Sequence, residues 1–107
     1  MDIRTRAIKL EKGMKIVYPV WGDREEALHL PKKPTPNTYN IVGSRITFVD
    51  ENGDVYAIPA LKGIEVALIL EGYTMDINLT VFFASGEAYP ASKKEEWNAL
   101  LNEMRSN

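Results

Sequence analysis

The stretch that decides the fold is ITFVDENGDVYAI, residues 46–58. Ile46 and Phe48 share one parity before an acidic centre, and Val42 extends their pattern towards the N-terminus. The centre contains Asn52-Gly53, a dipeptide favoured in tight hairpin turns because both residues tolerate a positive φ. Residues 55–58 then lead back with apolar and aromatic side chains. This stretch therefore predicts an antiparallel β-hairpin.

Other segments of the chain show the same alternation of apolar and polar residues. It runs through residues 14–20, 64–70 and 75–83, and shorter strands are expected within residues 1–10 and around Tyr89. In residues 75–83 the odd-numbered positions are apolar, so we expect them to line the core. About six strands in an antiparallel meander are predicted, an arrangement compatible with barrel-like closure.

The C-terminal segment predicts one amphipathic α-helix. Ser92 followed by Glu95 fits a capping box, which satisfies free backbone N–H groups at a helix start. The apolar positions after it then repeat at helical spacing: Trp97, Leu100, Leu101 and Met104. Such a stripe is expected to dock on the sheet. We therefore predict an α+β fold in a single domain, residues 1–107.

Residues 21–40 break the strand pattern. Asp23 followed by Glu26 predicts a short helix ending at Leu30. Three prolines, Pro31, Pro34 and Pro36, then favour an extended connection. A connection of about twenty residues is long for a compact domain, and such loops are often functional.

Composition removes most catalytic and metal chemistries. The 107 residues include no cysteine and one histidine, His29, so thiolate sites, disulfides and multi-histidine metal sites are excluded. We expect no cofactor, no metal and no enzymatic activity. No apolar run reaches the ~18 residues of a membrane span, and no signal-peptide pattern is recognised, so a cytoplasmic protein is expected.

The charges are divided unevenly along the chain. Residues 1–49 hold nine basic and five acidic residues, a balance of +4, whereas residues 50–107 hold four basic and ten acidic residues, a balance of −6. Single-stranded nucleic-acid binders combine a basic groove with aromatic platforms, and the first half contains both residue types. The overall charge of −2 disfavours this alternative.

The long segment is the main candidate for function. Its aromatic and charged side chains are of the types enriched at protein interfaces, and the candidate binding residues are Trp21, Arg24, His29, Lys32, Lys33 and Tyr39. We expect a non-catalytic domain that binds a protein partner, an accessory or inhibitory protein of a bacterium or bacteriophage. The alternative for Trp21 and Tyr39 is that they are core residues which anchor the loop. Unpaired sheet edges make homodimerisation a further expectation.

The segment YPASKKEEWNALL, residues 89–101, resembles the closing strand and helix of pleckstrin-homology-like domains, in which a tryptophan-bearing helix caps a sheet. The resemblance implies a binding domain without catalysis. Lipid-binding members of that family typically place clustered basic residues in the first hairpin, where this chain has Lys12 and Lys15 near Gly13. No ligand is carried over.

Overall fold

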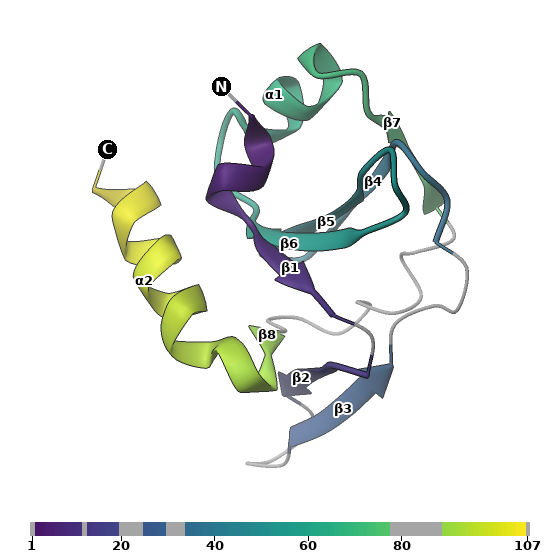
Figure 1. Ribbon diagram of the computed structural model, residues 1–107. Helices are drawn as coiled ribbons and strands as arrows, with labels where there is room; N and C mark the ends of the chain where they lie inside the picture. Colours follow the sequence, from purple (N-terminus) through teal and green to yellow (C-terminus); the bar gives the residue numbers. More distant parts are fainter. Residues whose placement is uncertain (1, 12, 20–24, 30–33, 78–88, 107) are drawn as a thin grey trace.

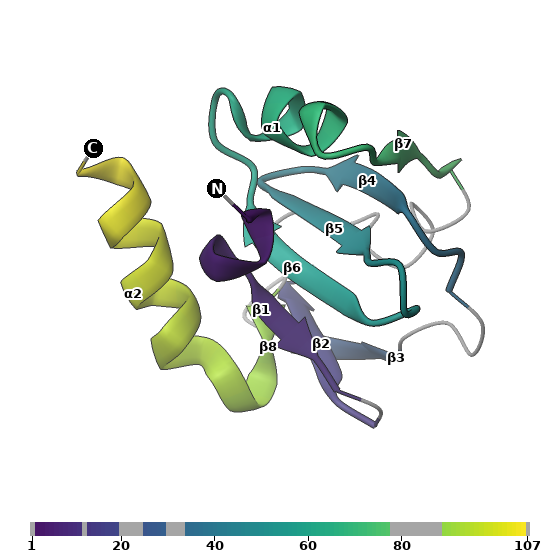
Figure 2. The same cartoon turned by 45° about the horizontal axis from the view of Figure 1, so that its top comes forward.

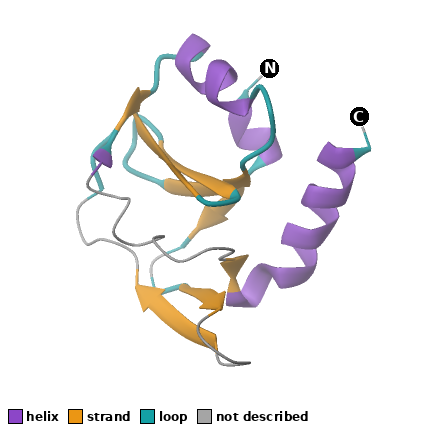
Figure 3. Cartoon of the chain, turned by 180° about the vertical axis from the view of Figure 1, so that it is seen from behind, coloured by secondary structure: helices purple, strands orange, loops and turns teal. Residues whose placement is uncertain are grey.

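The computed structural model describes residues 2–11, 13–19, 25–29, 34–77 and 89–106. These residues form two β-sheets and two α-helices (Figures 1 and 3). The strands are β1 (Ile8–Leu10), β2 (Lys15–Pro19), β3 (Glu25–His29), β4 (Thr38–Val42), β5 (Arg45–Val49), β6 (Val55–Pro59), β7 (Thr74–Met75) and β8 (Tyr89–Pro90). The helices are α1 (Ile64–Leu70) and α2 (Lys94–Arg105), with 3₁₀ turns η1 (Ile3–Arg6) and η3 (Ala91–Lys93).

The larger sheet has the strand order β1-β6-β5-β4-β7, and all its pairs are antiparallel except β4 with β7. The predicted hairpin is confirmed, because Val49 pairs with Val55 around the acidic turn. Asp50 Oδ1 closes that turn by accepting the backbone N–H groups of Asn52 and Asp54, each at 2.9 Å. Gly53 supplies the positive φ of 85° that the turn requires.

The strand before the hairpin is interrupted at Gly43, which has a φ of 61°. A tight turn there separates β4 from β5, which then pair in register from Val42 with Arg45 to Thr38 with Val49. As a result, Val42 belongs to a different core cluster from Ile46 and Phe48, although the sequence placed all three on one face.

The smaller sheet has the order β3-β2-β8, and its strand β2, Lys15–Pro19, lies within the strand predicted at residues 14–20. The short helix predicted from Asp23 to Leu30 is wrong over its described part, because residues 25–29 form strand β3. Each residue of β3 pairs with one of β2, from Pro19 with Glu25 to Lys15 with His29. Strand pairing therefore overrides a local helix signal within the segment predicted as a loop.

The strand predicted at residues 64–70 is also wrong, because these residues form helix α1. Its C-terminal end is a Schellman motif: Gly72 has a φ of 95° and donates its N–H to Ile69 O, and Tyr73 donates to Leu68 O, each at 3.0 Å. Ile64 and Leu68, four residues apart, face the sheet and are buried. An almost wholly apolar run satisfies both the strand and the helix period, and the glycine at its end selects the helix.

Two core clusters cover the two faces of the larger sheet. Beneath α1 lie Phe48, Tyr39 and Tyr73 with aliphatic neighbours, and the Phe48 ring stacks on Tyr56 at 5.0 Å between centroids. On the other face, Trp97 of α2 packs with Ile16 of β2 and residues of β1 and β6. Figure 2 shows α1 at the top and α2 at the left, at separate places on the outside of the molecule.

The chain ends differ in detail from the sequence prediction. Residues 3–6 form η1 before the strand β1, and Asp2 caps η1 by accepting the Arg4 backbone N–H at 2.9 Å. The C-terminal helix is confirmed, with Leu100 and Met104 packed against the clusters. Its predicted cap is wrong, because Ser92 lies within η3 and the N-cap residue is Lys93.

The α+β class with mostly antiparallel pairing is confirmed. Eight short strands replace the expected six, and the described strands form two open sheets without closing into a barrel. Met75 and Ile77, expected to line the core, are exposed, and residues 78–83 lie outside the described part. Within that part, no helix is long and apolar enough to cross a membrane.

Candidate protein-binding surface

Helix α1 exposes apolar side chains on the face that points away from the sheet. Its sequence is IEVALIL, in which Glu65 carries the single charge. Val66, Ile69 and Leu70 have exposed fractions of 59%, 55% and 81%. We call these three residues the outer α1 face. A helix that is apolar all round is typical of one covered on both sides.

Exposed apolar residues also lie in and just after strand β7. Met75 pairs with Tyr39, so it lies on the side of the sheet that α1 covers. Met75 is 48% exposed and Ile77, two residues later, is 77% exposed. Single exposed apolar residues are ordinary on protein surfaces, whereas a contiguous group marks an interaction site.

A hydrogen bond from the strand beneath holds α1 in place. The Tyr39 hydroxyl donates to Glu65 Oε1 at 3.2 Å. Burial, together with this carboxylate, raises the pKa of Tyr39. Tyr39 is 3% exposed, so its role in this structure is to pack beneath α1.

The side of α1 that faces η1 forms a groove with it. The groove has a volume of about 550 Å³, and its apolar side chains are Ile3, Ile64, Ala67 and Leu70. Lys62 and Arg6 lie near the N-terminal end of α1, where they also share a smaller hollow beside α2. At the other end of α1 lie Asp2 and Glu71. The apolar groove therefore has one basic and one acidic end.

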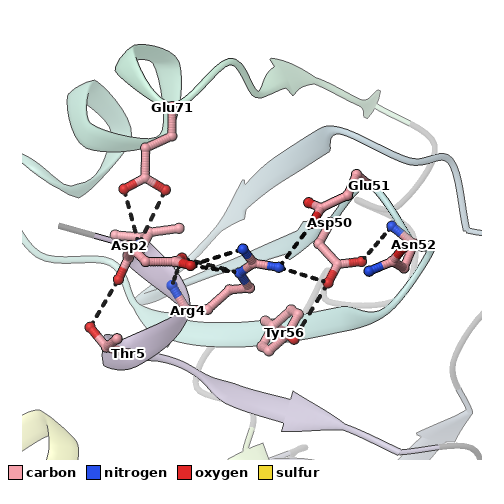
Figure 4. Close-up of polar contacts among 9 residues, drawn as sticks. Asp2, Arg4, Thr5, Asp50, Glu51, Asn52, Tyr56 and Glu71 are labelled. Atoms are coloured by element: carbon pink, nitrogen blue, oxygen red, sulfur yellow. Dashed lines mark hydrogen bonds and ion pairs between the residues drawn. The ribbon is translucent and has the colours of Figure 1, made fainter.

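A network of polar contacts fixes η1 beside α1 (Figure 4). Both carboxylate oxygens of Glu71 accept the Ile3 backbone N–H, at 3.0 and 3.1 Å. Arg4 Nη2 lies 2.8 Å from Asp2 Oδ2. Arg4 Nη1 lies 3.1 Å from Glu51 Oε1 and 3.4 Å from Asp50 Oδ2. The Arg4 guanidinium lowers the pKa of Asp2 by hydrogen bonding to it. These contacts hold both walls of the groove in position.

The structure describes two of the six binding residues predicted from the sequence, His29 and Tyr39. Trp21, Arg24, Lys32 and Lys33 lie outside the described residues. His29 is the last residue of β3, opposite Lys15. Tyr39 takes the alternative role considered for it, that of a core residue. His29 and Tyr39 lie in different sheets, and the described residues contain no group of three ligating side chains placed to hold a metal ion.

Several basic residues of the first half are occupied within the chain. Arg4 pairs with acidic residues, and Lys9 Nζ lies 3.5 Å from Asp54 Oδ2. Arg45 is buried, and its Nη1 donates to Val42 O at 2.8 Å. These contacts reduce the number of cations that could face a phosphate backbone.

The outer α1 face was missed because residues 64–70 were assigned to a strand. Two signals could have identified it. Glu71-Gly72-Tyr73 fits a helix C-terminus, and seven residues with one charge are more apolar than a helix with a solvated face should be.

No family model, curated protein or solved structure matches the chain. The chemistry of this surface is therefore the basis for a functional proposal.

Proposed function

We propose that this chain is a non-catalytic domain that works by binding another protein molecule, and that the contact is made by the outer α1 face with Met75 and Ile77. The observation that carries the proposal is the exposure of Val66, Ile69 and Leu70 on one short helix. Its partner presents an apolar surface flanked by charges of both signs, because the groove beside α1 has both.

Burying the outer α1 face in a contact is favourable in free energy. Fully burying a Val, Leu or Ile side chain contributes about 1.5–3 kcal/mol. The centre of a protein interface is typically depleted of charges and its rim is polar. The outer α1 face matches the centre, and the residues at the groove ends, Arg6, Lys62, Asp2 and Glu71, match the rim.

Site-specific photo-crosslinking tests the proposal. A photoreactive phenylalanine analogue replaces Leu70, and the matched control replaces Glu95 on the exposed side of α2. We expect covalent adducts with protein from position 70, in the purified sample or in the producing cells, and a much lower yield from position 95. Equal yields from the two positions in both settings would contradict the proposal.

A further inference from the structure

Lys62 and Glu71, the charged residues just outside the two ends of α1, oppose its dipole, whereas Glu65 in its first turn complements it. A helix N-terminus carries a partial positive charge and favours acidic neighbours, whereas the C-terminus favours basic ones. Lys62 precedes the first residue of α1 by two positions, and Glu71 follows its last residue directly. Among the described residues, neither Lys62 nor Arg6 takes part in an ion pair. This arrangement is suited to a contact beyond the chain itself.

We propose that the partner on the outer α1 face is a second copy of this chain, with the two α1 helices antiparallel across a two-fold axis. The inference rests on the proposed function, whose partner it identifies. In this arrangement Lys62 of each copy faces Glu71 of the other, and each helix end gains the charge that its dipole favours. Two-fold dimers are the commonest closed oligomers, and their contact residues must complement themselves.

The spacing of residues fits this antiparallel contact. Lys62 and Glu71 are nine positions apart and flank the seven residues of α1, whose length is about 10.5 Å at the helical rise of 1.5 Å per residue. When Lys62 lies opposite Glu71, Leu70 lies opposite Gly63 and Val66 lies opposite Ala67, so the contact is centred on Val66 and Leu70, with Ile69 at its edge. Gly63 and Ala67 both line the groove, and no atom lies within 4 Å of the place where a side chain on Gly63 would start. The most exposed side chain of the outer α1 face, that of Leu70, thus meets a position with free space.

Glu71, the acidic residue of the proposed contact, is already held in place. Both oxygens of Glu71 accept the Ile3 N–H, which limits the side chain to the end of the groove. Less side-chain freedom remains to be lost when Lys62 of the second copy approaches.

Charge reversal provides the test, with sedimentation equilibrium as the measurement. The unchanged chain is expected to show a concentration-dependent monomer–dimer equilibrium. Lys62→Glu places two acidic residues together at both ends of the contact and should weaken dimerisation at least about tenfold. The double variant Lys62→Glu with Glu71→Lys restores both pairs in reverse and should restore the dimer. Lys15→Glu, an exposed lysine on β2 with the same change of charge, is the matched control and should leave the dimer unchanged.

A second variant guards against misfolding, since Glu71→Lys also removes the acceptor of the Ile3 N–H. Leu70→Lys changes a side chain that is 81% exposed, so it should abolish the dimer while the circular dichroism spectrum is retained. Mixing the single variants Lys62→Glu and Glu71→Lys should give a heterodimer, visible by native mass spectrometry.

Three outcomes would overturn the inference: a monomer at every soluble concentration, a dimer unaffected by both Lys62→Glu and Leu70→Lys, or a double variant that keeps the circular dichroism spectrum of the unchanged chain and dimerises as weakly as Lys62→Glu alone. If the chain is monomeric but position 70 crosslinks to a different protein, the inference fails and the proposed function stands. If position 70 crosslinks no more than position 95, both fail.

Discussion

Helices α1 and α2 both pack on the core, but their exposed faces differ in composition. Helix α2 reads KEEWNALLNEMR, with five charged residues among its twelve. Trp97 points into the core, while Glu95, Glu96 and Asn98 are exposed. Helix α1 has one charge among seven residues and exposes Val66, Ile69 and Leu70.

The comparison separates the apolar helix residues that folding requires from those that it does not require. Both helices bury the side chains that face the core, so both have the inward stripe that a surface helix needs. Only α2 combines that stripe with a polar face for water. The outer apolar residues of α1 add little to the packing of the isolated chain, and the proposed contact with another molecule would account for their composition.

The largest expected effects come from truncating the inward stripe of each helix. Leu68→Ala should lower the free energy of unfolding by about 2–5 kcal/mol, and Trp97→Ala by about 3–5 kcal/mol, because each leaves a cavity in a packed core. Urea unfolding followed by far-UV circular dichroism measures both. Val66→Ala on the outer α1 face is the control and should change stability by less than about 0.5 kcal/mol. Equal losses for Leu68→Ala and Val66→Ala would show that α1 does not pack on the sheet as described.

Alkaline pH should weaken the α1 side of the molecule. Burial raises the pKa of Tyr39, Tyr56 and Tyr73, and all three lie in or against the cluster beneath α1. Their unfolded-state pKa is about 10. Because the folded-state pKa is higher, their contribution to stability is complete below pH ~10 and is lost as the pH rises through the folded-state value.

Urea unfolding on both sides of pH ~10, with tyrosinate absorbance as the titration signal, measures this effect. Tyr39→Phe removes one of the ionising groups and should make the loss of stability at high pH smaller than in the unchanged chain. The same pH dependence in both proteins would contradict a role for Tyr39 ionisation.

The sequence predicted the elements that depend on local signals. The hairpin around Asn52-Gly53 and the helix bearing Trp97 were both found, because turn chemistry and helical spacing act over a few residues. Strand β3 was missed because its backbone partner is β2, and its own residues fit a helix start.

The candidate surface could not be predicted in the same way. Residues 64–70 are apolar at nearly every position, so their periodicity does not distinguish strand from helix. Which of them are exposed depends on how α1 docks, through Ile64 and Leu68, on a sheet formed by distant segments. Tyr39 shows the opposite case: an aromatic residue beside a proline-rich stretch fitted either an interface or the core, and the fold buries it.

The smallest expected effect gives the sharpest contrast between the two helices. Leu70→Lys on α1 should change the free energy of unfolding of the monomer by less than about 0.5 kcal/mol, since Leu70 is 81% exposed and Lys has a similar helix propensity. The same substitution at Leu100 of α2, which packs against the core beside Trp97, should cost several times more. Urea unfolding at concentrations where the chain is monomeric measures both variants. A loss above about 1 kcal/mol for Leu70→Lys would mean that the outer α1 face serves folding, and its apolar character would then need no partner.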